Sequence, residues 1–313
     1  MYNNFIVSLE AVLPIAILIG VGLLAKRMQL LTREEISHVN KLVFKILFFC
    51  LLFQNMYNAD FSIAFQPQLL LFAFIAILAT VAIASVVVCH FVEDNKRRGA
   101  MIHSIYRSNF IIIGIPVAAN IYGHDNIATT AMLITVVIPL YNILAVTIFE
   151  TFRGNQIHLK PVLLGIIHNP MILGCLTGIL FNLCHLTIPH AILKPIFQIG
   201  SATTPLALIL LGASFTISSV VKNRLSIMLC SFARLIVAPA IILPIAVWMG
   251  YRNIELVSLM TVFAAPCAVV GFTMAQQMDS DYELAGNCII MTSGLSCFTI
   301  FGWIFLGKAL GLI

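Results

Sequence analysis

Charged residues are scarce in this chain. Only 9% of its 313 residues are charged and 61% are hydrophobic, whereas about a quarter of the residues of a typical soluble domain are charged. Such a chain has too little polar surface to stay dispersed in water, and this excludes an ordinary soluble protein. The net charge of +5 needs no nucleic-acid partner, because the basic residues sort by loop. We therefore predict an all-α integral membrane protein that lies in the lipid bilayer.

Patterns of catalysis and of metal binding are also missing. The sequence has no Cys-x-x-Cys pair, no His-rich metal spacing, no Gly-x-Ser-x-Gly elbow and no phosphate-cradling glycine loop. Its longest polar break, about ten residues, is too short for a separate soluble domain. We predict that the protein is not an enzyme, with no catalytic residues, no cofactor and no metal site. The eight cysteines look like small packing residues.

What the chain does contain is a series of apolar segments, each long enough to cross roughly 30 Å of hydrocarbon. Loops after the odd-numbered segments hold most of the Lys and Arg residues, and cytoplasmic loops carry such an excess. The prediction is a multi-pass protein of the cytoplasmic (inner) cell membrane with both termini outside. The ten expected spans cover residues 5–26, 38–57, 67–91, 100–121, 125–151, 161–183, 192–216, 224–250, 254–277 and 284–312.

The two halves of the chain echo each other. Pro14 and Pro170 open similar apolar strings 156 residues apart, and Pro116 and Pro266 lie 150 residues apart within spans 4 and 9. Because each half has five spans, an odd number, the second half must enter the membrane upside down. We expect two inverted five-helix repeats, over residues 1–152 and 161–313.

Paired proline interruptions in such repeats indicate a binding site near the membrane midplane. Proline removes a backbone donor and clashes with the preceding turn, and the amides of a helix that restarts carry partial positive charge. Two breaks that meet in the membrane therefore suit an anion, although single prolines often only kink a helix. The residues expected around the two breaks are Gly114, Ile115 and Pro116, and Ala265, Pro266 and Cys267.

Polar residues within the spans are the second group of candidates. A charge buried in lipid costs several kcal/mol and is a functional candidate by default. Arg107 and Arg234 could each hold a carboxylate, or could snorkel to the surface or pair with a backbone carbonyl. Asn109 precedes the break expected at Pro116 by two turns, and we predict that it binds substrate.

Asn142 and Asn287 occupy similar places in the two halves, where each could bind substrate or bridge neighbouring helices. His103 lies four residues before Arg107 and could titrate, although a histidine at a loop edge is more often inert. No Asp or Glu lies deep in a span. This absence weakens the case for coupling to protons or sodium, which usually employs buried carboxylates.

Three strings resemble the auxin efflux carrier family. Tyr106 to Val117 (YRSNFIIIGIPV), followed by Ile121-Tyr122-Gly123, is similar to the span 4 signature of that family. Thr204 to Phe215 (TPLALILLGASF) is similar to its span 7. Ala264-Ala265-Pro266 with Met274 to Gln277 (MAQQ) is similar to span 9 of its bacterial branch. The resemblance covers essentially the whole chain.

The resemblance implies ten spans whose spans 4 and 9 are broken at prolines and cross at the substrate site. It implies a scaffold of spans 1, 2, 6 and 7, dimeric through spans 2 and 7, and a mobile transport domain of spans 3–5 and 8–10 with elevator-like movement. Asn109, Pro116 and Pro266 match the family's site positions. Bacterial members are associated with malate, malonate and related carboxylates. Auxin is not expected here, because the chain lacks the large central loop and the charged pair in span 3 of the plant carriers.

Three functional hypotheses follow. The first is a permease for a small organic anion, a mono- or dicarboxylate. The second is a membrane sensor on the same fold that binds a ligand without transporting it, although no signalling domain is appended. The third is a sodium-coupled symporter of the bile-acid type, which shares the inverted-repeat crossover but would need carboxylates near the crossing.

Overall fold

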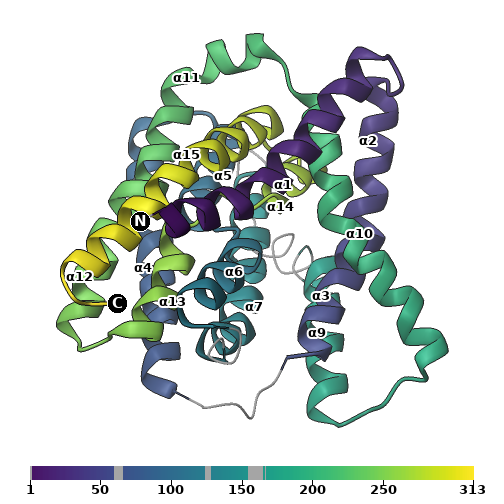
Figure 1. Cartoon of the computed structure of the whole chain (residues 1–313). Helices are drawn as coiled ribbons and strands as arrows, with labels where there is room; N and C mark the ends of the chain where they lie inside the picture. The colour runs from purple at the N-terminus through teal and green to yellow at the C-terminus, as the bar shows by residue number, and fades with distance from the viewer. Residues whose placement is uncertain (1, 60–65, 124–127, 154–164, 166) are drawn as a thin grey trace.

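The computed structural model describes residues 2–59, 66–123, 128–153, 165 and 167–313, and all of their regular elements are helical (Figure 1). This confirms the all-α expectation for the described part of the chain. The elements are α1 (Tyr2–Arg27), α2 (Arg33–Leu42), η1 (Val43–Leu47), α3 (Phe48–Tyr57), α4 (Pro67–Phe91), α5 (Asn95–Tyr106), α6 (Phe110–Tyr122), α7 (Ala128–Thr151), α9 (Pro170–Leu183), α10 (His190–Ser214), α11 (Ile217–Phe232), η3 (Ala233–Val237), α12 (Ala238–Trp248), α13 (Asn253–Ala264), α14 (Val270–Gln277) and α15 (Tyr282–Ala309), where η1 and η3 are π-helical turns.

Polar side chains mark where several helices begin. Asp94 and Asn169 each accept a hydrogen bond from the backbone amide two residues further on, at the starts of α5 and α9. Asp281 accepts one from the amide of Leu284 at the start of α15. These caps satisfy amides that the first turn of a helix leaves without partners, and so they fix the ends of the apolar segments.

Six described stretches are long and apolar enough to cross a membrane, which supports a multi-pass membrane protein. They are Arg33–Tyr57, Pro67–Phe91, Ala128–Thr151, His190–Ser214, Ile217–Trp248 and Tyr282–Ala309. Ten spans therefore stay a prediction. The structure covers span 5–26 with α1, but does not describe the side chains of residues 2–12; residues 125–127, 161–164 and 166 of spans 5 and 6 lie outside the described part.

The other two predicted spans are interrupted helices. Residues 100–121 are divided between α5 and α6, and residues 254–277 between α13 and α14. Each of these four helices has 13 residues or fewer, and at 1.5 Å per residue each is too short to cross about 30 Å of hydrocarbon alone. Only as pairs joined across a break could they span a bilayer.

The helices gather into two groups. The first group is α2, η1, α3, α9 and α10, which lie together on the right of Figure 1; the second contains α4 to α7 and α11 to α15. Helix α1 packs against α10 of the first group and against α15 of the second. A Cβ atom on Gly22 of α1 or Gly212 of α10 would overlap backbone atoms of the facing helix. Glycine at these positions lets the two backbones approach closely.

The breaks are not where the proline pattern placed them. Pro116 lies inside the continuous helix α6, and the first break falls at Arg107–Asn109 instead. Pro266 does lie in the second break. The last helical residues before the breaks, Tyr106 and Ala264, are 158 positions apart, close to the spacing of Pro14 and Pro170, so the 150-residue match was the wrong register. The expectation of two matching proline breaks is corrected accordingly.

Candidate functional site

The two interrupted helices meet at their breaks. The amide of Asn109 donates to the carbonyl of Pro266 (2.8 Å), and the amide of Ala268 donates to the carbonyl of Arg107 (3.1 Å). These two bonds form a short antiparallel bridge between Ser108 and Cys267. The bridge satisfies backbone groups that cannot be left bare in a membrane, and it fixes the two chain segments side by side.

Arg234 stabilises the crossing, which is the place where the two breaks, residues 107–109 and 265–269, lie side by side. Its side chain is completely buried and lies in the π-helical turn η3. The guanidinium donates to the carbonyls of Val262 (2.6 Å) and Ala265 (2.8 Å) at the end of α13, and to the carbonyl of Tyr106 (2.9 Å) at the end of α5. The last carbonyls of a helix have no partner within the helix, and a cation there also complements the helix dipole. Arg234 thus holds both helix ends together.

Arg107 lies in the first break, at the end of α5. One Nη donates to the side-chain oxygen of Asn142 on α7 (2.6 Å), and the other lies 3.4 Å from the carbonyl of Tyr141. The Asn142 amide in turn donates to the thiol of Cys175 on α9 (3.2 Å). Asn142 therefore positions Arg107 without neutralising its charge, because an amide carries none.

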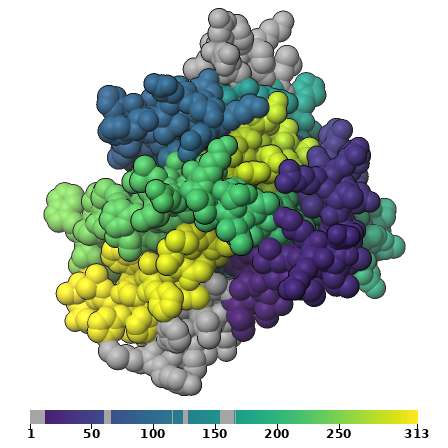
Figure 2. Space-filling view, turned by 90° about the horizontal axis from the view of Figure 1, so that it is seen from above, coloured from purple at the N-terminus to yellow at the C-terminus, as the bar shows by residue number. Residues whose placement is uncertain are grey.

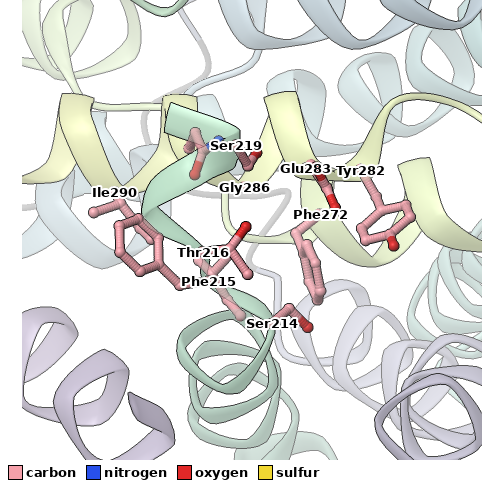
Figure 3. A pocket seen from close by; sticks show the side chains of 11 residues that line it. Ser214, Phe215, Thr216, Ser219, Phe272, Tyr282, Glu283, Gly286 and Ile290 are labelled. Carbon is pink, nitrogen blue, oxygen red and sulfur yellow. Dashed lines mark hydrogen bonds between the residues drawn. The ribbon is translucent and has the colours of Figure 1, made fainter. Parts of the chain in front are cut away.

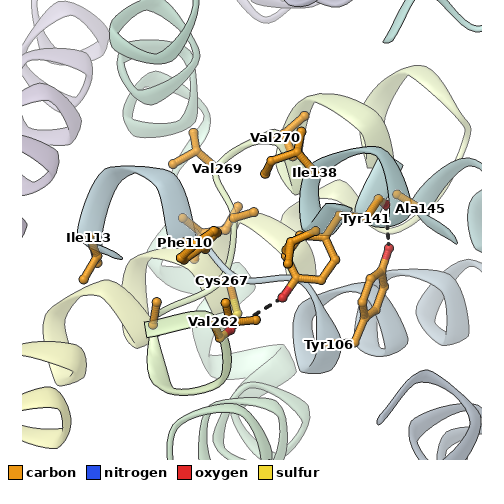
Figure 4. Packing of buried hydrophobic residues seen from close by; sticks show 14 of the residues in the cluster. Tyr106, Phe110, Ile113, Ile138, Tyr141, Ala145, Val262, Cys267, Val269 and Val270 are labelled. Carbon is orange, nitrogen blue, oxygen red and sulfur yellow. Dashed lines mark hydrogen bonds between the residues drawn. The ribbon is translucent and has the colours of Figure 1, made fainter. Parts of the chain in front are cut away.

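A cavity of about 120 Å³ lies against the crossing, well above the roughly 15 Å³ that one water molecule needs. One wall consists of the crossing segments and α7, and the other of α3, α9 and α10, so the cavity is shared by both groups of helices. It is lined by Phe48, Leu51, Leu52, Asn55, Arg107, Ser108, Asn109, Phe110, Ile111, Ile112, Ile138, Tyr141, Met171, Thr204, Ala207, Ala268, Val269 and Val270. Figure 4 shows Phe110, Ile138, Tyr141, Val269 and Val270 grouped around this point.

The polar groups at the crossing end of this cavity are mostly hydrogen-bond donors. The side-chain Nδ2 of Asn109 is buried and has no partner among the described residues. Helices α6 and α14 both begin at residues that line the cavity, where first-turn amides carry partial positive charge. Within the described part of the chain, neither Arg107 nor Arg234 forms an ion pair with a carboxylate. This end of the cavity is therefore suited to a negatively charged group.

The structure brings most of the predicted site residues to the crossing. Asn109, Ala265, Pro266 and Cys267 form it, as described above, and the Cys267 thiol also donates to the carbonyl of Ser104 (3.0 Å). Asn142 reaches it through Arg107. Arg234 contacts the crossing through bonds to backbone carbonyls. Pairing with carbonyls was the alternative to binding a carboxylate that the sequence left open for this residue.

Three of the predicted residues lie further along α6. Gly114 packs so tightly that an added Cβ would lie 2.8 Å from the ring of Phe110 and 3.0 Å from the hydroxyl of Thr261. Pro116 has an exposed side chain, and the side chain of Ile115 lies outside the described part. Neither Gly114 nor Pro116 lines the cavity. Gly114 instead allows α6 to pack on α13.

Asn287 lies elsewhere and does not share the surroundings of Asn142. Its amide donates to the hydroxyl of Ser219 (2.7 Å), and it lines a small pocket where the α10–α11 link meets α14 and α15. Figure 3 shows this pocket, with Phe215 and Thr216 on one side and Tyr282 and Glu283 on the other. The structure therefore does not place Asn287 at the crossing.

Some cavity residues were not among the predicted binding residues. The sequence left open whether Arg107 holds a carboxylate, snorkels to the surface or pairs with a carbonyl, and it did not single out Ser108; both residues line the cavity. Tyr141 was missed entirely; its hydroxyl contacts that of Ser108 (3.2 Å) and the carbonyl of Val262 (3.5 Å). The one sequence feature that could have indicated Tyr141 as a site residue is its position next to Asn142. Thr204 begins the second string on which the family resemblance rests.

Comparison with known sequences supports a transport role. The model of a family described as "Membrane transport protein" matches residues 7–304. An uncharacterized transporter of Methanothermobacter thermautotrophicus is 23% identical over 302 residues, covering 96% of this chain and 98% of the relative. An uncharacterized transporter of Methanocaldococcus jannaschii is 24% identical over 317 residues, covering 96% of this chain and 99% of the relative. The similarity thus includes both segments of the crossing.

Proposed function

The chain belongs to the membrane transport protein family, and from this premise we propose that it is a permease for a small organic anion. The family match confirms the resemblance to the auxin efflux carriers. The substrate class proposed is a small carboxylate such as malate or malonate, moved across the cytoplasmic membrane by secondary transport. The supporting observation is the cavity at the crossing, where the buried Arg107 has no carboxylate partner among the described residues.

The chemistry of the cavity supports an anion specifically. A carboxylate placed there could accept from the guanidinium of Arg107, from the unpartnered amide of Asn109, and from first-turn amides of α6 or α14. Hydrogen bonds between charged donors and a carboxylate are about twice as strong as neutral ones. Such bonds would repay the cost of removing the carboxylate from water, which is several kcal/mol.

The proposal extends to the architecture and the movement. We propose ten spans in two inverted repeats, with both termini outside, and a scaffold that contains α1, α2, α3, α9 and α10. The second group of helices would form the transport domain and move past the scaffold as an elevator. The position of the cavity between the two groups supports this, because sliding one group along the other would carry a bound anion with it. We also propose a homodimer through α3 and α10, the helices of spans 2 and 7.

The test is uptake by the purified chain in liposomes over a panel of labelled mono- and dicarboxylates. We expect saturable flux of at least one acid, and a large loss in Asn109→Ala, which removes the unpartnered donor. Asn120→Ala, at an exposed position near the end of α6, serves as the matched control and keeps full flux. Binding of an acid without any flux would favour the sensor hypothesis. The absence of both binding and flux across the whole panel would refute the proposed substrate class.

A further inference from the structure

A second and larger cavity lies on the outer side of the second group of helices. It has a volume of about 420 Å³ and lies between α4 on one side and η3 and α12 on the other. These segments belong to the neighbouring blue and green surfaces of Figure 2. Its lining is Phe72, Ile75, Ala76, Ala79, Thr80, Ile83, Ala84, Val87, Ile105, Ala233, Val237, Ala238, Ile241, Ile242 and Ile245. The hydroxyl of Thr80 donates to the carbonyl of Ala76 (2.7 Å), so the groove presents an apolar wall.

The groove is long, and its edges are exposed on the surface of the isolated chain. From Phe72 to Val87 it follows α4 for about 22 Å at 1.5 Å per residue, which exceeds half of a hydrocarbon core of roughly 30 Å. Ile75, Ile83 and Ile241 along its edges are each more than half exposed in the isolated chain. A groove of this shape on a membrane-facing surface fits an extended hydrocarbon chain.

One end of the groove is rich in cations. Arg98 donates to the carbonyl of Cys89 (3.1 Å), two residues beyond Val87. Arg97 donates to the hydroxyl of Ser226 on α11 (2.8 Å), and its Nε is buried with no partner among the described residues. Lys222 is exposed one turn before Ser226, on the helix face that continues into Ala233.

The acids near this end do not pair with those cations. Glu93 and Asp94 lie in the α4–α5 loop, and Asp281 caps α15. Among the described residues none of the three forms an ion pair with Arg97, Arg98 or Lys222, and the one acid that is paired nearby, Asp279, contacts Lys96 (3.7 Å). Asp281 lies near enough for the charge of Arg97 to act against the burial that raises its pKa, but the buried Nε of Arg97 still has no hydrogen-bond partner among the described residues where the apolar groove ends.

We propose that this groove is a binding site for an anionic phospholipid. One acyl chain occupies the groove between α4 and α12, and the phosphate is bound by Arg97 and Lys222. Basic pockets at the ends of membrane helices are suited to anionic headgroups, at about 1 kcal/mol for each cation near the surface. The inference is independent of the transported substrate, because this groove and the crossing cavity share no lining residue.

The bound chain would also support the crossing. Ile105 and Ala233 form part of the groove, and the guanidinium of Arg234, next to Ala233, lies 3.4 Å from the Ile105 carbonyl. An acyl chain in the groove fills space beside these bonds that would otherwise lack van der Waals contacts. The lipid is therefore expected to raise the melting temperature of the protein.

The experiment is native mass spectrometry of the purified full chain, titrated with phosphatidylglycerol or phosphatidylcholine. Wild type is expected to bind phosphatidylglycerol more tightly, by about fivefold for each cation that contacts the phosphate. Ala79→Phe fills the groove and weakens binding of both lipids. Ala82→Phe places the same ring on the same helix, at an exposed position outside the groove, and leaves binding unchanged.

The headgroup part is tested separately. Arg97→Gln combined with Lys222→Gln is expected to remove the preference for phosphatidylglycerol and to leave phosphatidylcholine binding as in wild type. Should the double variant fail to fold, Lys222→Gln alone, at an exposed site, reduces the preference about fivefold. Equal affinity of Ala79→Phe and Ala82→Phe for phosphatidylglycerol, or an undiminished preference after removal of the cations, overturns the proposal.

Discussion

At the scale of single residues, Arg234 shows how a buried charge can be structural. Its guanidinium contacts backbone carbonyls at the ends of α5 and α13 and forms no ion pair with an acid of the described chain. A carbonyl dipole is a weaker partner than a carboxylate, but three good bonds together compensate much of the cost of burial. The crossing therefore depends on this side chain as well as on the backbone bridge between Ser108 and Cys267.

We predict that Arg234→Met strongly destabilises the protein. The change leaves the carbonyls of Tyr106 and Ala265 without this donor and leaves the Val262 carbonyl only the long contact from the Tyr141 hydroxyl (3.5 Å), and orphaned buried groups together cost about 3 kcal/mol or more. Arg234→Lys is expected to recover only part, because one ammonium cannot follow the planar fork of the guanidinium. The measurement is the midpoint of thermal unfolding in detergent.

Arg224, an exposed arginine on the neighbouring α11, offers the matched control. Arg224→Met removes the same charge without touching the crossing, and we expect its melting temperature to stay near that of wild type. Equal melting temperatures for Arg234→Met and Arg224→Met would show that the carbonyl bonds contribute little.

We further predict that Asn142→Asp abolishes anion transport while the fold survives. The new carboxylate would lie at hydrogen-bond distance from Arg107 (2.6 Å in wild type) and neutralise the charge that the substrate needs. A loss of at least about 1.4 kcal/mol in binding, or tenfold in affinity, is expected. The measurement is substrate affinity and uptake, with Asn253→Asp, at the exposed first residue of α13, as the control; uptake by Asn142→Asp at the wild-type rate would rule out Arg107 as the anion contact.

At this scale the sequence predicted which polar residues are buried near the crossing better than it predicted what those residues contact. The absence of deep acids made Arg107 and Arg234 stand out, and both are buried near the crossing. Which of them faces the cavity depends on the π-helical turn that carries Arg234, and no local pattern in the sequence predicted that turn. Asn287 was expected to occupy a place similar to that of Asn142, but the structure places it against Ser219 and away from the crossing.

At the scale of elements, the cap of α15 has a defined pH dependence. Partial burial raises the pKa of Asp281 above the usual 3.8, although the bond from the Leu284 amide and the charge of Arg97 act in the opposite direction. The folded state therefore favours the protonated acid. Ionised Asp281 costs stability relative to a neutral residue, and this cost appears as the pH rises from 3.8 through the raised pKa.

We predict that Asp281→Asn melts at the same temperature as wild type or higher at pH 7. Asparagine keeps the side-chain oxygen that caps the helix and removes the ionisable group. The difference should shrink as the pH falls toward 4. Asp281→Ala, which loses the cap altogether, should melt lower than Asp281→Asn at both values; a melting difference between wild type and Asp281→Asn that grows on acidification would contradict the assigned direction.

Proline position was an incomplete guide to helix breaks. Pro266 lies in a break because the chain leaves the helix at Ala265 and bonds across to Asn109. Pro116 stays within α6, and a proline in a membrane helix is tolerated where neighbours satisfy the freed carbonyl. The first break falls instead on Arg107-Ser108-Asn109, whose backbone bonds to the second break, while the side chains of Arg107 and Ser108 contact α7. Long-range pairing, which local propensity does not report, decided the position.

At the scale of the whole molecule, a contact between the two groups of helices offers a test of movement. The side-chain amide of Asn40 on α2 donates to that of Gln276 on α14. If one group slides along the other during transport, this contact must break in every cycle. A covalent link at the same place would prevent it.

We predict that a short bifunctional thiol reagent blocks transport in Asn40→Cys/Gln276→Cys, built in a background without the eight native cysteines. Uptake should fall by at least about tenfold and recover when a cleavable link is reduced. Each single cysteine variant, treated in the same way, should keep its activity. Full uptake by the linked double variant would exclude relative movement of α2 and α14.

The cavity at the crossing has walls from both groups of helices, with Phe48 and Leu52 opposite Arg107. A compact acid touches both walls only lightly, whereas an acid with a long apolar tail would wedge between surfaces that have to separate. Such a molecule would be an inhibitor that occupies the site and never crosses. Chemists seeking a blocker of this protein could begin with a carboxylate head for Arg107 and lengthen the tail toward Phe48.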